Sequence, residues 1–170
     1  MSENVYMPKL ARIIDIKEES PGARAIKTFR VEFVNGDGFD HECGQCAMIS
    51  VFGKGESMIS IASAPAIKEY KQFSIMRTGR VTTAIHDMKV GDVIGVRGPY
   101  GNEFPINEWK GRNLVFVGGG VGLAPIWPVI QTAVANRDDF GKITVFYGSR
   151  TSRDIMYASF DADYSDQEIA

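Results

Sequence analysis

The sequence of 170 residues lacks four features that would each assign it to a broad class of protein. It has no cluster of lysine and arginine, and its net charge of -2 leaves no basic surface for nucleic acid or an anionic membrane. No apolar run approaches the roughly 18 residues that indicate a membrane span. No basic segment followed by an apolar one opens the chain, so we expect no secretory signal. Two cysteines cannot form a disulfide framework, and we expect a cytoplasmic protein.

Short segments with strand patterns, separated by turn signals, fill the first hundred residues. The clearest is 25–34, where Phe29, Val31 and Phe33 alternate with polar residues. A turn cluster, Asn35-Gly36-Asp37-Gly38, follows it directly. The predicted strands are residues 9–16, 25–34, 47–52, 58–63, 72–76 and 93–97, with one short helix at 82–88. Five or six strands of this length and spacing predict a small antiparallel β-barrel.

The pattern changes after Gly111. Residues 113–117 (NLVFV) form an apolar run that is typical of a strand buried on both faces. The run enters glycine-rich residues 118–122, which precede a helical pattern over 123–136 and a second buried strand over 142–147. This order predicts a β-α-β unit with parallel strands. We therefore expect a barrel domain at 1–110 and an α/β domain at 111–170, with the boundary near 109–112.

The second of these domains is expected to be incomplete, because one β-α-β unit cannot cover both faces of a parallel sheet. The sequence ends at 166–170, soon after a second helix is predicted to begin. Either the sequence is a truncated piece of a longer protein or a partner completes the fold, and we favour truncation.

The glycine-rich segment 118–122 (GGGVG) is the first candidate site. A strand that leads through glycines into a helix presents backbone N–H groups to an anion, usually a phosphate. Pro125 suits the first turn of that helix. The segment is not G-x-G-x-x-G, because Leu123 stands in place of the third glycine, and the next strand ends in Gly148-Ser149-Arg150 rather than an acidic residue. A tight turn without a ligand is the alternative.

The second candidate, Gly79-Arg80-Val81-Thr82-Thr83, opens the predicted short helix. Its hydroxyls and N–H groups suit either a helix cap or a pyrophosphate, and taken alone the segment favours the cap. A third segment, 58–65, places small and hydroxyl residues in a strand and by itself indicates little.

Together and in this order, these segments resemble the flavin reductase subunits of the ferredoxin-NADP reductase superfamily. The resemblance runs from Met7 to Tyr157. It is closest to the flavin subunits of NiFe hydrogenases (gamma type), anaerobic sulfite reductases (B type) and heterodisulfide-reductase-like complexes. The segments that carry it are 51–65, 79–83, 91–101, 117–125 and 147–151, and the stretch GDVIGVRGPYGNEFP is the most specific.

The resemblance implies a six-stranded antiparallel flavin-binding barrel followed by the first β-α-β part of an NAD(P)-binding domain. It implies a diaphorase-type NAD(P)H-dependent flavin oxidoreductase, with FAD as cofactor and NAD(P)H as substrate. Electrons would pass through FAD to iron–sulfur, hydrogenase or heterodisulfide-reductase-like partner subunits. A [2Fe–2S] cluster is expected only in a longer chain or a partner. The alternative is a non-catalytic flavin-binding subunit that serves for docking and electron relay in a larger redox complex. The choice between NADH and NADPH stays open.

The resemblance also implies the site residues, position by position. Ser60 is the catalytic candidate, beside the reactive N5 of the flavin. Gly79 and Thr82 match the element that holds the FAD pyrophosphate. The further implied flavin contacts are Ser57, Ile59, Ile75, Met76, Arg77, Val81 and Thr83. The implied dinucleotide contacts are Gly118, Gly119, Gly120, Val121, Gly122, Leu123, Pro125, Ser149 and Arg150.

Two positions depart from the family pattern. Ser57 stands where the family has an arginine, and Ile59 stands where an aromatic ring stacks on the flavin. Arg77 is a candidate for the missing charge, and subunits of this branch often carry an aliphatic residue at the aromatic position. The missing aromatic disfavours an oxygenase-reductase component. We therefore expect the fold to hold and FAD binding to be weak or labile.

Three further residue types carry structural expectations. Cys43 and Cys46 form a C-x-x-C motif at a turn whose usual sequence in the family is P-G-Q-F. Cys46 is therefore expected to be a small buried residue rather than a redox or metal ligand. We expect no metal site. His86 is expected on the exposed side of the short helix, and Pro128 is expected to kink the helix that follows the glycines.

Overall fold

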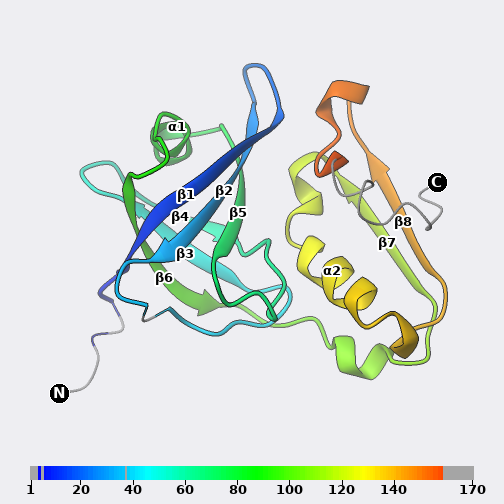
Figure 1. Ribbon diagram of the computed structural model, residues 1–170. Coiled ribbons are helices and arrows are strands. Elements are labelled where there is room, and N and C mark those ends of the chain that lie inside the picture. Colours follow the sequence, from blue (N-terminus) through cyan, green and yellow to red (C-terminus); the bar gives the residue numbers. More distant parts are fainter. Residues whose placement is uncertain (1–3, 5, 37, 159–170) are drawn as a thin grey trace.

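The structure is a computed structural model that describes residues 4, 6–36 and 38–158 of the chain. It contains a six-stranded antiparallel sheet and a two-stranded parallel sheet, which lie side by side (Figure 1). This confirms the predicted fold class, a barrel followed by a β-α-β unit. The predicted division at residues 110 and 111 stays a prediction, and the helix expected near 166–170 lies outside the described residues, as does Asp37 of the turn cluster.

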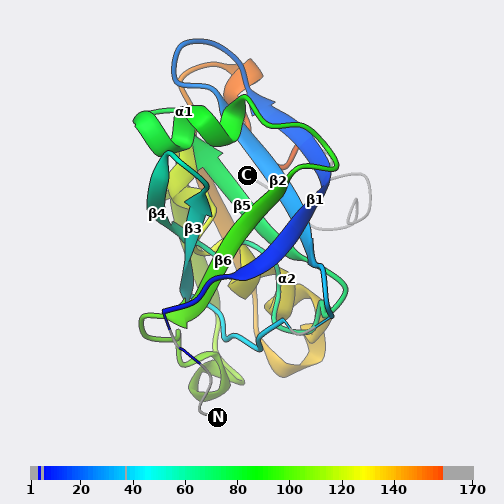
Figure 2. The same ribbon diagram turned by 90° about the vertical axis from the view of Figure 1, so that its left-hand side faces the viewer.

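The barrel is built from six strands in the order β4-β3-β6-β1-β2-β5. Their bounds are β1 Lys9–Ser20, β2 Ile26–Phe33, β3 Cys46–Val51, β4 Gly55–Ser60, β5 Lys71–Met76 and β6 Val93–Tyr100. The short helix α1 (Arg80–His86) lies over one end of the barrel (Figure 2). All six predicted strands and the helix are therefore confirmed, with ends shifted by a few residues.

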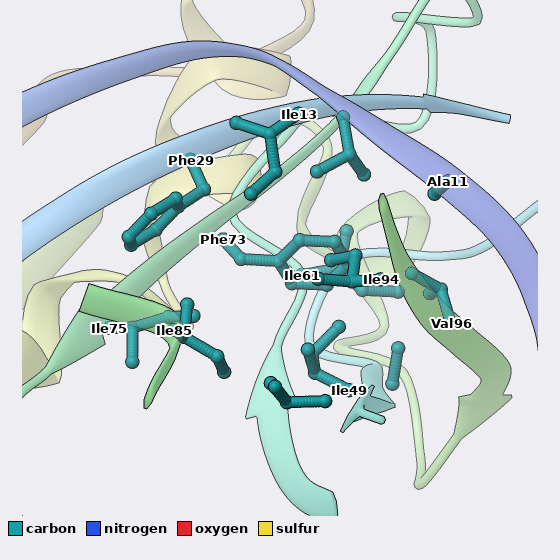
Figure 3. Close-up of a cluster of buried hydrophobic side chains, with 13 residues drawn as sticks. Ala11, Ile13, Phe29, Ile49, Ile61, Phe73, Ile75, Ile85, Ile94 and Val96 are labelled. Carbon is teal, nitrogen blue, oxygen red and sulfur yellow. The ribbon is translucent and has the colours of Figure 1, made fainter. Parts of the chain in front are cut away.

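The barrel core is formed by the apolar residues that alternate with polar ones along the strands. In β3, Ala47, Ile49 and Val51 are buried while their neighbours are half-buried, because successive side chains point to opposite faces of a strand. The inward residues of all the strands converge on one cluster, which Ile61 and the α1 residue Ile85 complete (Figure 3). Each buried aliphatic or aromatic side chain contributes about 1.5–3 kcal/mol to folding, so this cluster fixes the frame on which the candidate site is built.

Strand β1 extends four residues beyond its predicted end at Ile16. The charged run Lys17-Glu18-Glu19 hides the extension in the sequence, since it breaks the alternation. Two irregularities in the pairing of β1 with β2, between Ile13 and Asp15 and between Glu18 and Ser20, adjust the register. The extension gives the β1–β2 hairpin a long tip, which rises beside the end of β8 in Figure 1.

The second sheet pairs β7 (Leu114–Gly119) with β8 (Ile143–Gly148) in parallel, and α2 (Trp127–Ala135) connects them. Figure 1 shows α2 between this sheet and the barrel. Leu114 and Phe116 are buried. The expectation that these strands are buried on both faces is wrong for the described residues, where Val115 and Val117 are 63% and 72% exposed. Alternate side chains point away from α2, and no described element covers that face.

The helix between the strands begins later than predicted. Residues Gly120–Leu123 form a 3-10 turn, and α2 begins only at Trp127. Pro128 rather than Pro125 therefore occupies the first turn of the helix. A proline there lacks only an N–H that would have no partner within the helix, so the expected kink at Pro128 does not follow.

Candidate functional site

The barrel is open between β4 and β5. These strands end the six-stranded order, and they approach one another without forming a ladder. The gap is closed at one end, where the amide of Ala62 donates to the carbonyl of Gln72 at 2.7 Å. Along the rest of β4, the edge that faces β5 is free to meet a ligand with its backbone groups. The predicted flavin residues of β4 and β5 lie along this opening.

The two faces of β4 have different surroundings. Ser57 and Ile59 pair with Ile49 and Ala47, so they share the inward face of the sheet. Ile59 packs against the barrel core, so it is held by packing even though it stands where the family has a stacking aromatic. Ser60 is half-buried, and its hydroxyl makes no hydrogen bond with the part of the chain that the structure describes.

The end of β5 and the residues after it place the next candidates. Ile75 is 2% exposed and belongs to the barrel core, whereas Met76 packs against the second apolar cluster, as does Val121 of the glycine loop. Arg77 is exposed, and its amide donates to the carbonyl of Ala25 at 2.9 Å. The structure therefore brings Met76 and Val121 to the same cluster and leaves the Arg77 side chain outside it.

Thr82 caps α1. Its hydroxyl oxygen accepts hydrogen bonds from the amides of Gly79 at 2.8 Å and Thr78 at 3.0 Å, and the hydroxyl donates to the Gly79 carbonyl at 3.1 Å. With Thr82 8% exposed, this arrangement supports the capping interpretation. Thr83 is different, because it lines an open pocket of about 570 Å³ together with Lys54 and Arg80. Val81 packs half-buried against the barrel core.

The glycines of the loop divide into two kinds. A Cβ at Gly118 would lie 3.1 Å from the Leu123 side chain, so this glycine allows close packing of the strand against the turn. A Cβ at Gly122 would meet nothing within 4 Å, and Gly120 adopts a φ of +50° beside open space. Of the other two candidates in the turn, Leu123 is buried in the second cluster and Pro125 is half-buried. Open space beside glycine backbone is what a close-lying phosphate needs.

A pocket of about 600 Å³ lies between the barrel and the second sheet. Five candidates from the sequence meet there, namely Met76, Gly120, Val121, Ser149 and Arg150. The opposite wall is the tip of the β1–β2 hairpin, residues 20–24, which sequence reasoning missed. The sequence does contain a signal for it, since Pro21-Gly22 marks a turn. Its position opposite the glycine loop depends on the tertiary structure.

Hydrogen bonds set the charge of an acidic group in this pocket. The hydroxyls of Ser20 and Thr151 donate to the carboxylate of Asp154. These bonds stabilise the anion and hold the pKa of Asp154 below its usual range. The pocket therefore contains two arginines, Arg24 and Arg150, and one ionised carboxylate.

The burial of His86 and of the two cysteines differs from what the sequence predicts. His86 is 5% exposed, and its Nε2 lies 2.8 Å from the carbonyl of Ile75, so it is a buried residue rather than a surface one. Burial lowers the pKa of His86. Cys43 is the buried cysteine, at 2% exposure, whereas Cys46 is half-buried, and both are free thiols. Among the described residues, no three histidine, cysteine or carboxylate side chains gather closely enough to hold a metal ion.

The comparisons with known proteins agree with this architecture. Residues 116–166 match the family described as the oxidoreductase NAD-binding domain. Sulfhydrogenase 2 subunit gamma of Pyrococcus furiosus is 38% identical over 157 residues, which are 91% of this chain and 53% of the relative. A probable dihydroorotate dehydrogenase B (NAD(+)) electron transfer subunit of Methanocaldococcus jannaschii is 38% identical over 151 residues, 88% of this chain and 51% of the relative. The chain thus spans about half the length of these curated relatives.

The fold has solved counterparts. A mutant of the ferredoxin-NADP⁺ reductase of Plasmodium falciparum matches 99% of this chain and 71% of its own, with a TM-score of 0.81 and 21% sequence identity. At that identity the likeness shows the fold. The chain is thus similar in fold to ferredoxin-NADP⁺ reductase and similar in sequence to gamma and electron transfer subunits, and its residues 116–166 match the oxidoreductase NAD-binding domain.

Proposed function

We propose that the chain is the electron-entry part of a flavoprotein oxidoreductase of diaphorase type, which transfers electrons between NAD(P)H and an iron–sulfur partner through FAD. One observation carries the proposal. The end of β5, beside the open β4–β5 edge, and the glycine loop after β7 meet at one apolar cluster, against which Met76 and Val121 pack. A flavin on the barrel edge and a nicotinamide on the loop would thus be neighbours.

The chain offers a consistent set of groups for FAD. The free hydroxyl of Ser60 and the Ser57 side chain lie on β4, and open space surrounds Gly79 at the start of α1. The cation missing at position 57 has replacements in Lys54 and Arg80, which share a pocket with Thr83. They fit a pyrophosphate better than Arg77, which lies outside that pocket. A bound flavin supplies the redox chemistry, and these residues bind and orient it.

The second sheet offers the groups for NAD(P)H. Gly120 and Gly122 leave room for a phosphate beside the backbone, and Ser149 and Arg150 follow the end of β8. In parallel sheets, ligands bind beyond the carboxyl ends of the strands. The carboxyl ends of β7 and β8 face the hairpin tip across the pocket, where the dinucleotide would lie.

We infer the partners from the named relatives, a hydrogenase subunit and electron transfer subunits. The chain would pass electrons to an iron–sulfur, hydrogenase or heterodisulfide-reductase-like subunit. A [2Fe–2S] cluster would lie in a partner or in a longer chain. Among the described residues, no helix has the length and apolar character to cross a membrane. A cytoplasmic location stays a prediction.

The alternative is a flavin-binding subunit that anchors the other subunits of a larger complex and relays electrons between them, without nicotinamide chemistry. The placement of Ile59 favours it, because this side chain packs into the barrel core where an aromatic ring would stack on a flavin. The absence of an arginine at Ser57 points the same way. Both features lower the expected affinity for FAD without changing the fold.

The absorption spectrum of the purified protein distinguishes the two functions. An NAD(P)H-dependent reductase shows flavin bands in the near-ultraviolet and blue, which bleach when NADH or NADPH is added without oxygen. Flavin bands that neither nucleotide bleaches would support the docking subunit instead. A colourless protein that cannot be reconstituted with FAD would refute the proposed mechanism.

A further inference from the structure

Hydrogen bonds hold both walls of the pocket between the hairpin tip and the glycine loop. The Ser20 hydroxyl bonds the Asp154 carboxylate, and the amide of Tyr157 donates to the buried carboxylate of Glu19 at 2.9 Å. On the side of the barrel, the amide of Arg77 donates to Ala25 at 2.9 Å. The base of the hairpin is therefore tied both to β5 and to the segment after β8. These bonds hold the base of the wall that residues 20–24 form.

The opposite wall is fixed as well. The hydroxyl of Tyr147 lies 3.3 Å from the carbonyl of Gly120 and 3.4 Å from that of Asp154. This side chain joins the glycine loop to the turn after β8. Between the walls, Ile26 and Met76 give the pocket an apolar floor. Its volume of about 600 Å³ falls in the usual range of small-molecule sites, which is roughly 300–1,000 Å³.

The charges in the pocket are unevenly compensated. Asp154 is held as an anion and lies near enough to Arg150 for the two charges to interact. Arg24 lies on the hairpin wall and forms no ion pair with any described residue. The lining thus carries one arginine more than it has carboxylates, and the excess charge belongs to the barrel side. An arginine without a carboxylate on a pocket wall is suited to bind a phosphate.

We propose that Arg24 is a binding residue that contacts a phosphate group of the nicotinamide dinucleotide, so that the hairpin of the barrel forms half of the dinucleotide site. This inference rests on the proposed function, because it takes the ligand class from it. It adds a contact from the flavin-binding side of the molecule, facing the glycine loop across the pocket. The phosphate lies between Arg24 and the loop at Gly120, with the apolar floor below it.

Binding of ADP-ribose tests the proposal without turnover. ADP-ribose carries the diphosphate and lacks the nicotinamide. We expect Arg24→Ala to weaken its binding about tenfold or more in titration calorimetry, because one charge-assisted contact to phosphate is lost. Arg24→Lys should recover most of the affinity, since the charge remains. The FAD content of each variant, read from its absorbance, should equal that of the unaltered protein.

The matched control is Arg153→Ala, which removes an exposed arginine that does not line the pocket. We expect it to change ADP-ribose affinity less than about twofold. Equal losses in the two alanine variants would reduce the effect to general surface charge and overturn the inference. Unchanged binding in Arg24→Ala would overturn it while leaving the proposed function intact. An unaltered protein that retains FAD and binds no ADP-ribose would refute the nucleotide half of the proposed function as well.

Discussion

His41 and Lys71 form a buried pair at the end of the barrel where β5 begins. The two residues are 4% and 3% exposed. The Lys71 ammonium lies 3.0 Å from Nδ1 of His41, so Nδ1 accepts and the ring carries its hydrogen on Nε2, which donates to the carbonyl of Ser63 at 2.9 Å. A second proton on the ring would face the ammonium. Burial, the largest cause, together with this lysine lowers the pKa of His41 to about 4.

Because of this pair, we expect the free energy of unfolding to fall under mildly acidic conditions. The unfolded His41 has its usual pKa of 6.5 and the folded one about 4, so the unfolded state binds more protons between these values. The contribution of His41 to the free energy of unfolding is complete above pH 6.5 and is lost as the pH falls toward 4. It amounts to about 3 kcal/mol, and His86 changes in the same direction.

Urea unfolding between pH 7.5 and 4.5 measures this loss. The carboxylates with lowered pKa, Asp40 and Asp154, add little in this window because their unfolded pKa is 3.8. His41→Gln can still donate to Ser63 and accept from Lys71, and it does not titrate. Its stability should therefore change much less with pH. An equal slope in both proteins would show that His41 is not the source.

At the scale of elements, α1 shows how one side chain caps a short helix. The helix has seven residues, and helices this short are marginal by themselves. The Thr82 hydroxyl accepts from two amides that precede the helix. The next residue, Thr83, has the same side chain and lines a pocket with Lys54 and Arg80. The two threonines are thus expected to serve stability and ligand binding separately.

Valine replaces threonine with nearly the same shape and separates these roles. Thr82→Val should lower the free energy of unfolding by about 1–2 kcal/mol, because two capped amides lose their acceptor. Thr83→Val should change it by less than about 0.5 kcal/mol and reduce the FAD retained after gel filtration. Thermal melts and flavin absorbance measure both effects. If Thr83→Val kept its full FAD content, the pyrophosphate would lie elsewhere.

At the scale of the whole molecule, Tyr157 joins the barrel to the second sheet. Its ring stacks on Trp127 of α2 with centroids 4.2 Å apart. Its hydroxyl lies 2.6 Å from that of Ser74 on β5, and its amide donates to Glu19 on β1. The residue adopts a φ of 59°, which is unfavourable for tyrosine, so these contacts outweigh a local strain.

This junction predicts a graded response to substitution. Tyr157→Phe should cost about 1 kcal/mol through the lost hydrogen bond, and Tyr157→Ala about 3–5 kcal/mol through the lost ring. Hydrogen exchange should accelerate in α2, β7 and β8 more than in β1–β6, because the barrel keeps its own core. Exchange that rises equally in both parts would show that Tyr157 supports the barrel instead of the junction.

Much of this architecture could be predicted from the sequence, because the signals are local. Alternation in β2 and β3 arises from side chains that point to opposite faces of a strand, and the glycine run after β7 marks a turn into a helix. The start of α2 was misplaced, since the 3-10 turn and the helix share one apolar pattern. The buried position of His86 was missed, because the acceptor at Ile75 lies on another element.

The sequence by itself determined the strands, the short helix and the β-α-β order, since each depends on neighbours in the chain, and the candidate residues were those that the family resemblance implies. Only the tertiary structure decided which candidates meet. It placed Thr82 in a cap and Thr83 in a pocket, and it brought Arg24 opposite Gly120. The physical reason is that a ligand site depends on contacts between residues about a hundred positions apart, and local patterns carry no information on that distance.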